Sequence, residues 1–132
     1  MRLRDAVRRS RVLANIVVGA AALWVFAAGL RWGTLAATGA DSYGYVSQAS
    51  LWLHGSLIID QPIATTVPWP VADWTFAPLG YRPGLKAGTI VPVFPTGLPI
   101  VMAVLQAVGG PDAVYLAVPL LGALMVLASA GL

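Results

Sequence analysis

Residues 39–55, GADSYGYVSQASLWLHG from Gly39 to Gly55, decide how the chain is interpreted. Apolar side chains recur there at the spacing of one helical face, whereas Ser47, Gln48, Ser50 and His54 fall away from it. This pattern predicts a short amphipathic helix over about residues 41–54. A helix of this kind, lying between strongly apolar segments, is typical of a bilayer surface. We therefore expect Asp41 at its water-facing start.

The composition indicates an integral membrane protein. Of the 132 residues, 58% are hydrophobic and 10% are charged, whereas about a quarter are charged in soluble domains. The chain contains no cysteine, which excludes disulfides, thiolate metal sites and redox chemistry on sulfur. We expect an all-α protein of the cell membrane with about three transmembrane helices. A large extracytoplasmic loop would carry the amphipathic helix.

Basic residues gather at the amino terminus, where arginine occupies positions 2, 4, 8, 9 and 11. Arginines directly before an apolar run are typical of a cytoplasmic flank, so we expect the amino terminus inside the cell. The same residues explain the pI of about 9.8 without a nucleic-acid partner. A cleavable signal peptide is the alternative interpretation. The apolar run exceeds the usual ~7–15 residues and further apolar segments follow, which favours an uncleaved anchor.

Apolar segments then predict the topology. Residues 12–30 are the first expected transmembrane helix, because at ~1.5 Å per residue they span roughly 28 Å of the ~30 Å hydrocarbon core. Residues 31–90 are the extracytoplasmic loop, and residues 91–108 are a proline-rich lead-in followed by the second helix. A cytoplasmic turn at 109–112 precedes the third helix at 113–132. No charged flank closes that last run, so we expect a truncated piece of a longer polytopic protein.

Two further motifs accompany Asp41 and the stretch 44–49. They are Pro78-Leu79-Gly80-Tyr81-Arg82-Pro83 and Phe94-Pro95-Thr96-Gly97-Leu98-Pro99. With an acidic residue just after the first helix, this pattern resembles the amino-terminal part of GT-C membrane glycosyltransferases, over about residues 10–132. The closest groups are protein O-mannosyltransferases and bacterial transferases of lipid-linked arabinose, aminoarabinose or mannose. The resemblance implies sugar transfer from a polyprenyl-phosphate donor to an extracytoplasmic acceptor.

The resemblance also implies roles for particular residues. Asp41 matches the position of the acidic residue that takes the proton from the acceptor hydroxyl. A phosphate leaving group calls for a cation, so Arg82 and Lys86 are expected to bind substrate together with Tyr45. Ser42 stands where many members carry a second acidic residue, and we expect neither a metal nor another cofactor. Membrane lipid and the sugar donor are the expected partners, and the oligomeric state stays open.

Simpler structural roles compete with each of these assignments. Asp41 could act only as the N-cap of its helix, and His54 could cap the other end. Arg82 and Lys86 could contact lipid headgroups, and the loop tryptophans could anchor at the bilayer interface. The alternative to an enzyme is a small non-enzymatic multi-span subunit or a transporter fragment. Even as part of an enzyme, this chain is expected to be inactive alone.

Overall fold

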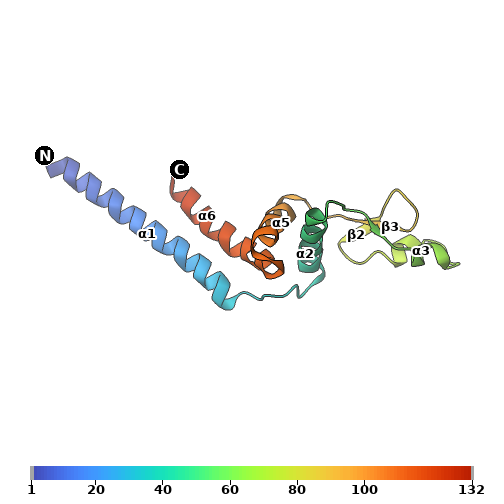
Figure 1. Ribbon diagram of the computed structural model, residues 1–132. Coiled ribbons are helices and arrows are strands. Elements are labelled where there is room, and N and C mark those ends of the chain that lie inside the picture. The colour runs from blue at the N-terminus through green and yellow to red at the C-terminus, as the bar shows by residue number, and fades with distance from the viewer. Residues whose placement is uncertain (1, 132) are drawn as a thin grey trace. The chain divides into compact units, whose positions relative to one another are not determined.

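The computed structural model describes residues 2–131, with side chains from Val7 onwards. Most of these residues are helical, and the chain divides into two compact units. Unit 1 joins the amino-terminal segment up to Thr34 to the segment from Leu116 onwards, and unit 2 comprises Leu35–Tyr115. Figure 1 labels the main elements of both units.

Unit 1 consists of two helices, α1 (Arg2–Trp32) and α6 (Ala117–Gly131). The helical stretches Val7–Trp32 and Pro111–Gly131 are long and apolar enough to cross a membrane. Helix α1 includes the basic segment as well as residues 12–30, because arginine is a good helix former and neither glycine nor proline interrupts residues 2–18. Two of the expected long apolar helices are thus present in the structure.

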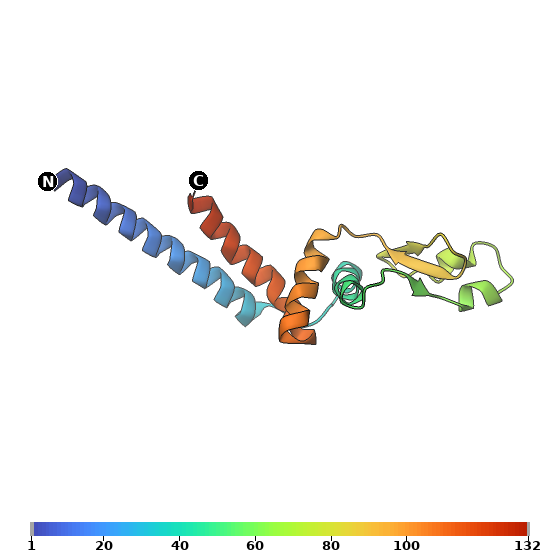
Figure 2. The same ribbon diagram turned by 45° about the horizontal axis from the view of Figure 1, so that its top comes forward.

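Small residues bring α1 and α6 together. A Cβ atom added to Gly29 would lie 2.8 Å from Cγ of Pro119, and one added to Gly122 would lie 3.1 Å from Cγ1 of Val25. Glycine at such positions allows close approach of helix backbones, as in helix pairs of membrane proteins. Figures 1 and 2 show the two helices meeting near the start of α6 and diverging toward their N- and C-terminal ends.

Unit 2 is built on a pair of packed helices, α2 (Ala40–Leu53) and α5 (Gly97–Gly109). Two single-turn helices, α3 (Ile63–Thr66) and α4 (Ala72–Thr75), lie in the long connection between them and contact each other. The 3-10 helix η1 (Pro111–Leu116) follows α5 and leads directly into α6.

A small sheet in unit 2 corrects the expectation of an all-α fold. Strands β1 (Ile59–Asp60), β2 (Tyr81–Pro83) and β3 (Thr89–Pro92) form an antiparallel sheet in the order β1-β3-β2. The β2–β3 connection contains Gly88, whose φ of 70° lies in the left-handed region that glycine adopts readily. Strands of two to four residues are too short for an alternating pattern to be recognised in the sequence.

Helix α2 buries a side chain of its polar face, which the helical pattern did not predict. Gln48 is 1% exposed and Ala49 of the apolar face is 0% exposed, whereas Trp52 and Leu53 of that apolar face are 38% and 46% exposed. The inward side chains bond to other parts of unit 2: Ser47 to Tyr81, Gln48 to the Phe94 carbonyl, and Ser50 to Gln106. These partners were not apparent from helical periodicity, because each comes from a distant segment.

The expected second transmembrane helix is shorter than a membrane span. Helix α5 has 13 residues, which at ~1.5 Å per residue gives roughly 20 Å against the ~30 Å hydrocarbon core. Prolines set its start: Pro92 ends β3, and Pro99 lies in the first helical turn, where its missing N–H is tolerated. Gly110, with φ of 84°, ends it. Within residues 2–131, two helical stretches rather than about three are therefore long enough to span.

Candidate functional site

Asp41 lies in the first turn of α2, where its side chain is exposed. The N-cap is Gly39, and the side chain that caps the helix belongs to Ser42. The Ser42 Oγ accepts a hydrogen bond from the Gly39 N–H at 3.0 Å and donates to the Gly39 carbonyl at 3.0 Å. The alternative that Asp41 is the N-cap is therefore wrong. Its carboxylate is left available to contact a ligand, at the end of the helix dipole that favours an anion.

A close contact with Phe94 holds this end of α2 against the β2–β3 hairpin. The ring of Phe94 fills the space that Cβ atoms on Gly44 and Gly80 would occupy. Tyr45 packs on the same ring with centroids 4.6 Å apart. Tyr45 is half-buried, and its ring contact is a packing contact within unit 2. The sequence did not predict this close approach, although a glycine inside a predicted helix, at Gly44, is a signal that could have indicated it.

Tyr81 and Ser47 form a hydrogen-bonded pair beneath that contact. Tyr81, the first residue of β2, is 7% exposed, and its hydroxyl bonds to the Ser47 hydroxyl. Burial raises the pKa of the Tyr81 phenol; the Ser47 hydrogen bond lowers it, and the nearby Tyr43 raises it again. Tyr81 belongs to the motif at residues 78–83, and the sequence predicted no role for it.

Gln48 is the most buried polar side chain of α2. Its amide nitrogen donates to the Phe94 carbonyl at 3.4 Å, while its Oε1 is buried with no protein partner within the described residues. Buried amides are usually hydrogen-bonded through both atoms, so Gln48 Oε1 is an exception among the buried polar atoms of the described residues. Sequence periodicity assigned Gln48 to the solvent side and gave no indication of this burial.

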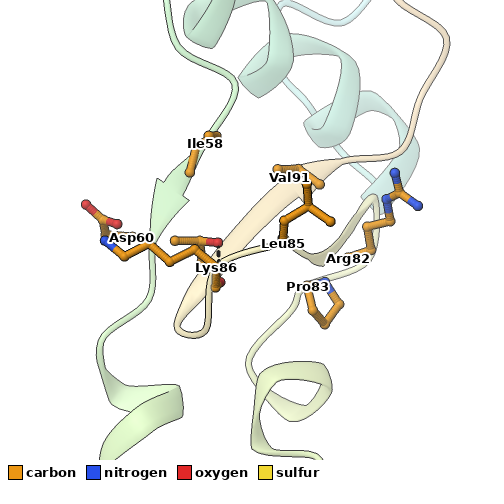
Figure 3. A pocket seen from close by; sticks show the side chains of 9 residues that line it. Ile58, Asp60, Arg82, Pro83, Leu85, Lys86 and Val91 are labelled. Atoms are coloured by element: carbon orange, nitrogen blue, oxygen red, sulfur yellow. Dashed lines mark hydrogen bonds between the residues drawn. The ribbon is translucent and has the colours of Figure 1, made fainter.

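Arg82 and Lys86 line a hollow of about 550 Å³ on the β2–β3 hairpin, together with Asp60. Its walls are largely apolar and include Ile58, Leu85 and Val91. Figure 3 shows that Lys86 extends toward the Asp60 side of the hollow, whereas the Arg82 guanidinium points away from Lys86. The two cations thus share a lining but do not converge on one point.

The structure does not bring all the predicted site residues into one cavity. Asp41 and Tyr45 belong to α2 and do not line the hollow that Arg82 and Lys86 share. Within the described part of the chain, no group of three or more His, Cys, Asp or Glu side chains could hold a metal ion. His54 is the C-cap of α2, and its Nδ1 lies 2.6 Å from the Ser50 carbonyl, as the simpler interpretation predicted.

Comparison with known proteins gives no relative. No protein-family model, no curated protein and no solved structure matches this chain.

Proposed function

We propose that the chain is the amino-terminal part of an integral membrane glycosyltransferase of the GT-C type. The enzyme would move a sugar from a polyprenyl-phosphate donor to an acceptor outside the cytoplasm. The observation that carries the proposal is the exposed, uncommitted carboxylate of Asp41 in the first turn of α2, shortly after a helix that is long and apolar enough to span a bilayer. The sequence resemblance supplies the reaction class.

Asp41 acts as the general base in this proposal. It accepts the proton of the acceptor hydroxyl while that oxygen forms a bond to the anomeric carbon of the donor sugar. The bond from this carbon to the phosphate oxygen breaks, and the phosphate leaves with the electron pair. Because Ser42 caps α2, the Asp41 carboxylate can serve the reaction without loss of the helix start.

Arg82 and Lys86 provide the positive charge for the phosphate. The hollow that they line has apolar walls, which suit the first isoprenoid units of the donor, and charge at its rim, which suits the phosphate. Asp41 does not line this hollow, so the remaining contacts of the sugar come from parts of the enzyme outside this chain. For the same reason, the chain alone is expected to be inactive.

The topology proposed here places the amino terminus in the cytoplasm and residues 35–110 on the extracytoplasmic side, so that the stretch Pro111–Gly131 crosses back. The arginine-rich start supports the first part. The length of α5 supports the second, since a helix of 13 residues leaves the Gly109–Asp112 turn on the same side as α2. Reporter fusions at Ser10 and Asp112 test this arrangement. A cytoplasmic signal from the Asp112 fusion would restore α5 as a membrane crossing.

Replacement of Asp41 by asparagine is the experiment that tests the catalytic assignment. A positioned general base contributes ~10²–10⁴-fold to the rate, so Asp41→Asn in the complete enzyme is expected to lose activity by that factor. Expression and membrane insertion should stay unchanged, because Ser42 still caps the helix. The matched control is Asp112→Asn, which changes another exposed aspartate in a first helical turn. Transfer at saturating donor and acceptor is measured per amount of inserted protein.

A non-enzymatic membrane subunit is the second candidate function. The separation of Asp41 from the hollow of Arg82 and Lys86 favours it, because a subunit that only binds lipid needs no shared cavity. The two candidates differ in the Asp41→Asn result: equal transfer rates in this variant and in Asp112→Asn would reject the general base and leave the binding role.

A further inference from the structure

Five exposed apolar side chains gather on the part of unit 2 that carries α3 and α4. Ile63, Trp69, Val71, Trp74 and Leu79, which we call the tip surface, are 47–78% exposed. Ile63 lies in α3, Trp74 lies in α4, and Val71 is the N-cap of α4. Trp69 and Leu79 lie in the connections on either side of α4, which contacts both α3 and β2. Figure 1 shows α3 beside the strands, at the end of unit 2 away from α2 and α5.

The backbone of the tip surface is strained at Val71, although the side chain of this residue is exposed. It is the only non-glycine residue with positive φ in residues 2–131, with φ of 55°. A β-branched residue in the left-handed region is strained, and the Val71 side chain is nonetheless 71% exposed. The strain is therefore not offset by burial of this side chain within unit 2. Two prolines, at 68 and 70, fix the chain just before it.

Several polar groups of this segment are bonded within it, which lowers the cost of contact with lipid. The hydroxyls of Thr65 and Thr66 donate to carbonyls of their own turn at 2.8 Å and 3.0 Å. Five backbone N–H groups between Trp74 and Tyr81 also donate within the segment, and they belong to Trp74, Thr75, Phe76, Ala77 and Tyr81. Each donor that is satisfied in this way lowers the cost of placing the segment in an apolar medium.

Charge distribution also distinguishes this segment. From residue 61 to residue 81 the one charged side chain is Asp73, and its carboxylate accepts a hydrogen bond from the Gly88 N–H at 3.3 Å. Trp69 stacks on Phe76 with ring centroids 6.0 Å apart. Tryptophan, the residue type of Trp69 and Trp74, is enriched at bilayer interfaces.

Both chain connections of unit 2 are short, since α1 ends at Trp32, α2 begins at Ala40, and η1 runs directly into α6.

We propose that the tip surface inserts into the interfacial region of a phospholipid bilayer, so that unit 2 is held at the membrane by its own side chains as well as by its connections. This rests on the membrane placement in the proposed function and not on the transferase activity. Ile63, Trp69, Val71, Trp74 and Leu79 then lie at the headgroup–acyl boundary.

Spin-label accessibility tests the proposal directly, because the chain has no cysteine of its own. Single variants Val71→Cys and Leu79→Cys are labelled in the full chain, reconstituted in phosphatidylcholine–phosphatidylglycerol nanodiscs. Ala87→Cys is the matched control, since Ala87 is exposed beside Lys86 on the hairpin. Val17→Cys, 64% exposed on α1, reports whether the long helix lies in lipid. Collision with oxygen and with a water-soluble nickel chelate is measured for each label.

Both tip labels are expected to collide preferentially with oxygen, as the Val17 label does, and the Ala87 label preferentially with nickel. Nickel preference at both tip positions, with the Val17 label still in lipid, would reject the tip proposal and leave the membrane placement intact. Nickel preference at Val17 as well would reject both. Labels at Val71 and Leu79 shielded from both reagents would show that protein, either another segment or a second copy, covers the surface.

Discussion

Substitution of Gly44 by alanine tests the contact that holds the start of α2 on the hairpin. A Cβ atom there would overlap the ring of Phe94, and this ring cannot move freely. Tyr45 packs on it, the backbone of Gly80 faces it, and the Phe94 carbonyl accepts from Gln48. The substitution therefore forces either the ring or the helix to shift.

Two opposing effects set the size of the loss. Alanine inside a helix raises the free energy of unfolding by ~0.5–1 kcal/mol relative to glycine. Overpacking a well-filled contact lowers it by ~1–3 kcal/mol. Because the overlap is with a confined ring, we expect Gly44→Ala to lower the free energy of unfolding by about 1–2 kcal/mol. At ~4–8 °C per kcal/mol for a unit of this size, the midpoint falls by roughly 4–16 °C.

Thermal unfolding in detergent, followed by tryptophan fluorescence, measures this loss. The control is Gly97→Ala, because a Cβ atom on Gly97 has no atom within 4 Å. Its midpoint should equal or exceed that of the parent. The double variant Gly44→Ala, Phe94→Leu should lose less stability than the sum of the losses of the two single variants, because leucine leaves room for the new Cβ atom. A Gly44→Ala midpoint at or above that of the parent would refute the packing argument.

Other predictions concern the polar contacts of unit 2. The pKa of Tyr81 in the folded state is raised above its ordinary value of ~10. Its contribution to the free energy of unfolding is therefore complete below about pH 10 and is lost as the pH rises through the folded-state pKa. Above about pH 10, the midpoint of thermal unfolding should fall more steeply with pH in the parent than in Tyr81→Phe, and equal slopes of midpoint against pH would contradict this. Ser50→Ala and Gln106→Leu should each cost ~1 kcal/mol, because each leaves a part-buried partner without its bond. Urea unfolding of the double variant should show less than the sum of the two losses, and strict additivity would contradict the pairing.

The long apolar helices were the most predictable part of the fold. Their composition alone indicates α1 and α6, because twenty or so uncharged residues in sequence form no other stable span. The length of α5 was harder to predict from the sequence. Pro95 and Pro99 indicated that the helix begins after the proline-rich lead-in, and the structure gives it 13 residues. The sequence indicated a short extended piece near β1, but its pairing with β3 joins residues 59–60 to 89–90 across a long separation. Strands β2 and β3 pair across a short hairpin, and they escaped prediction because they have only three and four residues.

The burial of Gln48 in α2 was not predicted, for a physical reason. Periodicity assumes that polar side chains seek water, and Gln48 instead finds the carbonyl of Phe94. Among the site residues, Asp41 was placed at the start of α2 by its small and polar neighbours. The alternative role of N-cap belongs to Gly39 instead, and Ser42 supplies the side-chain hydrogen bonds. Arg82 and Lys86 line one hollow because the β2–β3 hairpin brings them together, and the sequence did not indicate this hairpin.

The pairing of α1 with α6 has a consequence for biosynthesis. All of residues 35–115 are synthesised after Gly29 and before Pro119. At ~5–20 residues per second, the interval between these two residues lasts roughly 4.5–18 s. During that time α1 has no α6 to pack against, so its early insertion depends on its own apolar length. The contact at Gly29 therefore forms late, after all of residues 35–115 have been synthesised.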